Sequence, residues 1–141
     1  SEGSIYTIAY ELARAEAIQH AITTIKCRHF GCVLIVNGKI VGISNNQPGL
    51  LNHAERRVLG IYSAFNEVID VVELVIVRVR KDEEFSMGMA KPCSNCLPIL
   101  NHMNVRRVHY STGNDLEMVI ENVCIMTTDH VCSGTRLWEC E

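Results

Sequence analysis

Apolar residues recur along the chain with two different periods, and these periods predict helices and strands. Near the start they recur every three or four positions, which is typical of one face of an amphipathic helix, so a helix is expected over about residues 4–25. The residues of this apolar stripe are Ile5, Ile8, Leu12, Ala15, Ile18, Ile22 and Ile25. Two β-branched runs within residues 32–44 then flank Asn37-Gly38, a dipeptide that favours the tight turn of an antiparallel hairpin.

The rest of the chain continues with helical and extended patterns in turn. A polar loop ends at Asn52, a suitable N-cap, and a second helix is expected to begin there. The nearly unbroken β-branched run at 71–79 predicts a strand that is covered on both faces. Pro92 suits the start of a third helix. Two further strands are expected at 106–111 and 116–121, the second antiparallel to the first.

This order of elements predicts an α/β fold. We expect a three-layer α-β-α arrangement in which a mixed five-stranded sheet has helices on both faces. The length of 141 residues is that of one ordinary domain. Because no linker, repeat or low-complexity segment is visible, residues 1–141 are expected to form a single domain.

The composition is that of a globular protein, with 48% hydrophobic and 21% charged residues. No stretch reaches the roughly 20 apolar residues that a membrane span needs. Since the start of the chain also lacks the pattern of a signal peptide, a cytoplasmic protein without a membrane partner is expected, with a nuclear or virus-encoded protein as the alternative. The 7 cysteines lack secretory spacing and favour free or metal-bound thiols, with Cys32 and Cys124 interpreted as small core residues.

The charge of the chain argues mildly against a nucleic-acid partner. A net charge of −3 provides no overall basic field for nucleic acid. Short basic clusters occur at Arg56-Arg57, Arg78 to Lys81, and Arg106-Arg107. Because no aromatic residues are interleaved with them, we interpret these clusters as solvated faces or strand ends rather than as a track for phosphates.

Four residues in two segments have the chemistry of a catalytic metal site. His53 and Glu55 lie two positions apart at the expected start of the second helix. Cys93 and Cys96 follow Pro92 at the expected start of the third. Two thiolates and an imidazole suit zinc, and three ligands leave one coordination position open, as in catalytic zinc sites. Glu55 would then lie beside the metal and carry protons rather than bind the ion.

The pattern H-A-E at 53–55 followed by P-C-x-x-C at 92–96 resembles the signature of the zinc-dependent cytidine and deoxycytidylate deaminase superfamily. The resemblance extends to the order of helices and strands over about residues 5–122. It implies that the histidine and the two cysteines are ligands of Zn²⁺ and that Glu55 is the general acid and base of a hydrolytic deamination.

The same resemblance implies contacts with a substrate. Asn46 resembles the asparagine with which many members contact the sugar or base, and Asn45 is its close competitor. The backbone N–H of Ala54 and the carbonyl of Lys91 resemble the groups that hold the base. Read from the residues alone, the two asparagines before Gln-Pro-Gly fit ordinary turn chemistry as well. The histidine and phenylalanine at 29–30 either line the mouth of the pocket or are, respectively, solvated and packed in the core.

The resemblance implies a hydrolase that acts on a nucleobase, with cytosine in a free nucleoside or nucleotide as the first choice of substrate. An antiparallel last strand resembles the free-nucleoside branch, whereas a histidine ligand and the lack of Asn-x-Glu after Asn46 depart from it. One alternative is a deaminase of bases in single-stranded nucleic acid or tRNA, where H-A-E is common; another is a non-catalytic zinc-binding module. Superfamily members of this length usually associate, so a homo-oligomer is also implied.

Overall fold

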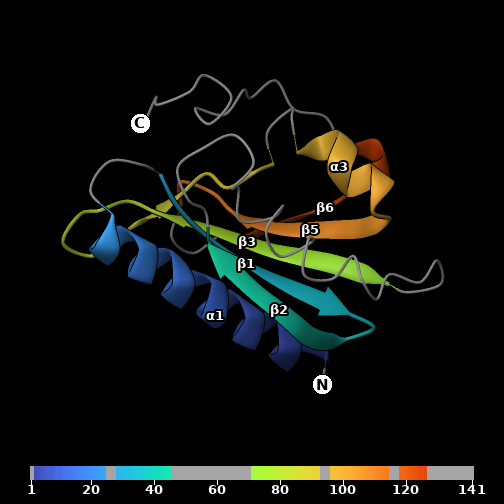
Figure 1. The fold of residues 1–141 in the computed structure, drawn as a ribbon, viewed down its shortest axis with the longest axis horizontal. Helices are drawn as coiled ribbons and strands as arrows, with labels where there is room; N and C mark the ends of the chain where they lie inside the picture. Colours follow the sequence, from blue (N-terminus) through green and yellow to red (C-terminus); the bar gives the residue numbers. More distant parts are fainter. Residues whose placement is uncertain (1, 25–27, 46–70, 93–95, 115–117, 127–141) are drawn as a thin grey trace.

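The computed structural model describes residues 2–24, 28–45, 71–92, 96–114 and 118–126. Within these segments one mixed sheet has the strand order β2-β1-β3-β5-β6, with a short β4 paired to β3 (Figure 1). The strands are β1 (His29–Val36), β2 (Lys39–Asn45), β3 (Val72–Val79), β4 (Met87–Gly88), β5 (Val105–Ser111) and β6 (Met118–Asn122). The helices are α1 (Glu2–Thr23), α3 (Leu97–His102) and the 3-10 turn η2 (Val123–Ile125).

The pairing of the strands confirms the predicted α/β fold with a mixed sheet. Strand β1 pairs antiparallel with β2 and β3, β3 pairs parallel with β5, and β6 pairs antiparallel with β5. The two-residue strand β4 was not predicted, and it pairs antiparallel with the end of β3. The loop between them is shaped by Asp82, whose carboxylate accepts hydrogen bonds from the backbone N–H groups of Glu84 and Ser86 at 3.1 and 3.0 Å.

Helices cover both faces of the sheet, which confirms the three-layer arrangement for the described part of the chain. Helix α1 packs on one face, against β1, β2 and β3, while α3 and η2 lie on the other (Figure 1). The second predicted helix, from Asn52, lies outside the described residues. None of the described helices has the length and apolar character needed to cross a membrane.

The face that α1 buries is made of small residues. Four alanines at helical spacing are each 0% exposed: Ala9, Ala13, Ala17 and Ala21. By contrast, Ile8 and Ile22 of the predicted apolar stripe are 49% and 61% exposed, so that stripe is only partly the buried face. Gly31 of β1 explains the difference, because a Cβ added there would lie 1.9 Å from the Ala13 carbonyl oxygen. Only small side chains permit so close a contact between helix and strand.

The predicted hairpin between β1 and β2 is confirmed. Asn37 and Gly38 have φ angles of 52° and 79°, as a two-residue turn of this kind requires. The Asn37 backbone N–H donates to the Val71 carbonyl at 2.9 Å, and the Val71 N–H donates to Asn37 Oδ1 at 2.9 Å. These bonds fix the turn against the residue that precedes β3.

One of the two cysteines assigned to the core is buried. Cys32 is 0% exposed on the face that carries α3, as predicted. Cys124 is exposed, so its assignment to the core was wrong. It lies in the short turn η2, where Val123 is the residue that turns inward.

Candidate metal centre and active site

Of the predicted metal ligands and the predicted proton carrier, Cys96 is the one that lies in the described part of the chain. The others lie outside it, as do two of the predicted substrate contacts, whereas Asn45 and Lys91 are described. The residues outside it are Asn46, His53, Ala54, Glu55 and Cys93. Their roles therefore stay predictions.

Cys96 immediately precedes α3, and its side chain is 0% exposed. Its carbonyl accepts the Leu100 N–H at 3.0 Å, which begins the hydrogen bonding of the helix. Pro98 lies in the first turn, where a missing N–H removes no helical hydrogen bond. Leu100 belongs to the same buried cluster as Leu34 and other residues of the sheet on this face, so the helix holds Cys96 above the α3 side of the sheet.

The segment that leads to Cys96 is attached to the end of β5. The Ala90 N–H donates to the Ser111 carbonyl at 2.9 Å, and Ser111 Oγ donates to the Gly88 carbonyl at 2.8 Å. Lys91 Nζ lies 3.4 Å from a carboxylate oxygen of Glu121 on β6. The lysine side chain thus forms an ion pair at this point, and the role predicted for its carbonyl stays a prediction.

Asn45 points away from the face that carries Cys96. Its Nδ2 donates to Glu16 Oε1 of α1 at 2.8 Å, and its partner in the register is Gly31, which faces the same helix. The sheet therefore separates the Asn45 side chain from Cys96. This position does not suit the substrate contact for which Asn45 was the competitor of Asn46.

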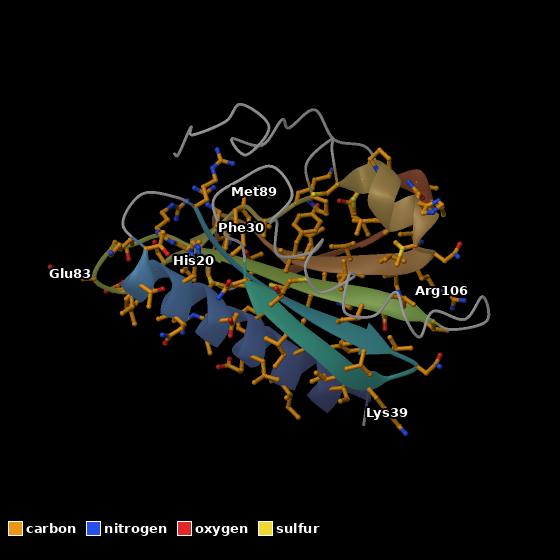
Figure 2. All side chains as sticks on the ribbon, viewed as in Figure 1. His20, Phe30, Lys39, Glu83, Met89 and Arg106 are labelled. Atoms are coloured by element: carbon orange, nitrogen blue, oxygen red, sulfur yellow. The ribbon has the colours of Figure 1, made fainter. Side chains whose placement is uncertain are left out.

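Residues 29–30 place their side chains on opposite faces of the sheet. His29 is 6% exposed, and its Nδ1 lies 2.9 Å from Nδ1 of His20 on α1, so the alternative of a solvated histidine is wrong. Burial and the nearby charges of His20, Lys81 and Arg78 lower the pKa of His29 to about 4. Phe30 packs partly buried against the cluster on the α3 side (Figure 2).

A buried ionisable cluster on the α1 face was missed by the sequence analysis. Glu73 of β3 accepts a hydrogen bond from Tyr6 Oη at 2.6 Å, and its Oε1 lies 2.8 Å from Arg107 Nε. His109 Nε2 lies 3.2 Å from the same oxygen, and its ring stacks on Tyr6 at 4.6 Å between centroids. Burial raises the pKa of Glu73, but the hydrogen bonds from Tyr6 and His109 and the Arg107 charge outweigh it and leave that pKa below its usual value. The one sign of this cluster in the sequence was the carboxylate of Glu73 inside an apolar run.

The described residues test the predicted metal only through Cys96. Among them, no group of three or more His, Cys, Asp or Glu side chains is arranged to hold a metal ion. A buried thiol at a helix start is nevertheless a donor that suits zinc, because soft sulfur ligands favour that ion. Cys96 therefore fits its predicted role.

Comparison with known proteins gives one likeness to a solved structure. No family model matches the sequence, and no curated protein matches it. The chain is similar to the crystal structure of dCMP deaminase from the cyanophage S-TIM5 in apo form, with 21% sequence identity and a TM-score of 0.47. The likeness covers 72% of this chain and 80% of that one. A functional assignment therefore depends on the residues of the chain itself.

Proposed function

We propose that this chain is a zinc-dependent hydrolytic deaminase that acts on cytosine in a free nucleoside or nucleotide. The observation that carries the proposal is the pair of motifs H-A-E at 53–55 and P-C-x-x-C at 92–96. Together they provide three zinc ligands, His53, Cys93 and Cys96, and one carboxylate. The complete burial of the Cys96 thiol at the start of α3 supports the assignment, because a ligand held by a helix is oriented before the metal binds.

In the proposed reaction, water adds to C4 of cytosine and ammonia leaves, so that the product is uracil. Zinc, when bound, supplies the polarisation that makes water a nucleophile near neutral pH. The Glu55 carboxylate accepts the proton that the water loses and delivers protons to the base and to the departing amine. Asn46 and the backbone N–H of Ala54 hold the sugar or base in this proposal.

Two features support a free nucleoside or nucleotide over a polynucleotide. Strand β6 runs antiparallel to β5, which is the arrangement that resembles the free-nucleoside branch. The net charge of −3 is also unfavourable for nonspecific contact with a long polyanion.

We also propose that the protein is a homo-oligomer, because superfamily members of this length usually associate. Sedimentation of the zinc-loaded protein at micromolar concentration measures the state directly. A monomer under these conditions would contradict the proposal.

The experiment that tests the mechanism is Glu55→Gln, which keeps the size and polarity of the side chain but removes its ability to carry a proton. Zinc should stay bound while the deamination rate falls by about 10²–10⁴-fold or more. If Glu55 merely favours the N-terminus of a helix, the substitution should cost only about 0.3–1 kcal/mol of stability and leave turnover intact. The matched control is Glu83→Gln in the exposed loop before β4, which should keep the wild-type rate.

Zinc content, melting temperature and rate should be measured on the same sample of each variant. Substrates should include cytidine, deoxycytidine, their 5′-monophosphates and a short single-stranded oligonucleotide, with ammonia release and product base as readouts. A Glu55→Gln variant that retains zinc and deaminates at near wild-type rate would refute the mechanism. Zinc-loaded wild-type protein that releases no ammonia from any of them would favour the non-catalytic module instead.

A further inference from the structure

One buried serine joins three strands beside the segment that leads to Cys96. Ser111 is the last residue of β5 and is 0% exposed. Its Oγ accepts the Arg78 N–H of β3 at 3.0 Å and donates to the Gly88 carbonyl of β4 at 2.8 Å. The Ser111 carbonyl accepts the Ala90 N–H at 2.9 Å. Both Gly88 and Ala90 are therefore attached to this serine.

Lys91, the residue after Ala90, is attached through its side chain. Its Nζ lies 3.4 Å from Oε2 of Glu121 on β6, and Tyr110 Oη donates a hydrogen bond to the same oxygen. Because Tyr110 is only 5% exposed, its hydroxyl holds the Glu121 carboxylate against the sheet. The lysine and glutamate side chains are 27% and 30% exposed, so solvent weakens this ion pair but does not surround it.

These attachments fix a short piece of backbone on the face that carries Cys96. Ala90 is 1% exposed and belongs, with Tyr110, to the buried cluster on the α3 side of the sheet. Lys91 is thus held both by the backbone of the residue before it and by its own side chain, and its peptide group has little freedom to rotate. The position of the Lys91 carbonyl is therefore set before a ligand binds, and binding then requires no ordering of this group.

An acceptor fixed in this way distinguishes the two bases of the proposed reaction. Cytosine carries an amino group at C4, which donates hydrogen bonds, whereas uracil carries a carbonyl there, which accepts them. A fixed carbonyl oxygen beside C4 pairs with the amino group but opposes a second carbonyl. A loosely held segment could turn its carbonyl away and admit both bases. Rigidity at Lys91 is thus a means of rejecting the product.

We propose that Ser111 and Glu121 are positioning residues that fix the Lys91 carbonyl and thereby make the candidate active site bind cytosine in preference to uracil. This proposal rests on the proposed deaminase function and on the contact with the base that the family resemblance implies for that carbonyl. Ser111 acts through the backbone of Ala90, and Glu121 acts through the side chain of Lys91. Neither residue needs to touch the substrate.

The test removes each attachment in turn. Ser111→Ala deletes the hydroxyl, Ser111→Thr retains it, and Glu121→Gln removes the negative charge of the ion pair. One matched control is Tyr6→Phe, which deletes a hydroxyl that donates a 2.6 Å hydrogen bond on the α1 face. The other is Glu83→Gln, in the exposed loop before β4 (Figure 2). Melting temperature and zinc content show whether each variant is folded and loaded.

Substrate and product are then measured separately on the zinc-loaded proteins. Kinetics with cytidine and cytidine 5′-monophosphate give kcat and KM, and uridine and its monophosphate, added as competitive inhibitors, give Ki. The base preference is the ratio of Ki for the uracil compound to KM for the matching cytosine compound. Calorimetric titration with all four compounds gives the same preference as a ratio of Kd values if the protein shows no turnover.

The wild type should prefer the cytosine compounds, and Ser111→Ala should lower this preference about 3–10-fold, because a hydrogen bond to the base is weakened. Glu121→Gln should lower it about 2–5-fold, as expected for the loss of a partly exposed ion pair. Ser111→Thr and both controls should keep the wild-type preference. A purely structural role of the hydroxyl would instead lower the melting temperature and weaken the binding of both bases equally.

A folded, zinc-loaded Ser111→Ala protein with the wild-type preference would overturn the proposal, and so would an equal loss of affinity for both bases. If Ser111→Ala does not fold, Glu121→Gln decides the question by the same two criteria. Ammonia release with an unchanged preference in the variants would leave the deaminase standing without these positioning residues. A preference that the variants lower, in a protein that releases no ammonia, would support the fixed carbonyl and refute the deaminase.

Discussion

Replacing Gly31 by alanine tests the close contact between α1 and β1. The added Cβ would lie 1.9 Å from the Ala13 carbonyl oxygen and 2.8 Å from the Ala17 backbone nitrogen. Both atoms belong to the backbone of one turn of α1, so no side-chain rotation can relieve the overlap. Either the helix moves away from the strand or the strand bends.

The size of the effect follows from that geometry. A Cβ and a backbone atom in ordinary contact lie more than 3 Å apart, so the backbones of α1 and β1 must separate by about 1 Å. A gap of that size loses about a quarter to a half of the van der Waals attraction of each atom pair between the helix and the strand. Overpacked cores typically lose about 1–3 kcal/mol, and a clash with backbone belongs at the upper end. We therefore expect a loss of about 3 kcal/mol in the free energy of unfolding, or about 10 °C in Tm.

Urea denaturation and thermal melting of Gly31→Ala measure this loss. The matched control is Gly113→Ala after β5, where the nearest atom to the new Cβ is Arg80 Nη2 at 3.6 Å, an ordinary contact. The control should stay within about 0.5 kcal/mol of the wild type. A Gly31→Ala protein as stable as Gly113→Ala would show that the contact between helix and strand is not as tight as described.

Further predictions concern the buried ionisable groups and the metal ligand. Glu73→Gln should cost about 1–3 kcal/mol in urea denaturation, because it weakens the hydrogen bonds at a buried acceptor, while the Arg107 side chain, 39% exposed, stays partly solvated. Since the pKa of Glu73 is lowered on folding, this contribution should be present above pH 4.5 and lost as the pH falls below it. The pKa of His29 falls from 6.5 to about 4 on folding, so between these pH values the unfolded chain binds a proton that the native protein does not. The free energy of unfolding should therefore decrease by up to about 3 kcal/mol as the pH drops from 6.5 towards 4. His29→Gln should flatten the profile between pH 6.5 and 4.5. Cys96→Ala should lose zinc in elemental analysis, and a variant that retains one zinc per chain would remove this cysteine from the ligand set.

The sequence predicted those parts of the fold whose signal is local. The period of apolar residues indicated α1, and Asn37-Gly38 indicated the turn whose positive φ angles the structure contains. It did not predict which face of α1 is buried, because alanines give a weaker hydrophobic signal than isoleucines. That face is decided by Gly31, which becomes a neighbour of the helix only after β1 has packed against it.

Features that depend on distant partners were the ones missed. Strand β4 has two residues and no pattern of its own, and it forms because Asp82 closes the loop after β3. Glu73 is buried because Tyr6, from another element, reaches its carboxylate. For the candidate site, motif spacing identified Cys96 as a ligand candidate, and its burial agrees with that role.

The position of β1 between β2 and β3 has a consequence for synthesis on the ribosome. Helix α1, β1 and β2 are contiguous in sequence and contact one another, so they can assemble while later residues are still being added. Strand β3, the other neighbour of β1, begins only at Val72. Until then the free edge of β1 presents unpaired amide groups beside the apolar run from Val33 to Ile35, and exposed edges of this kind promote aggregation. A nascent chain that stalls before Val72 is therefore expected to need protection by a chaperone.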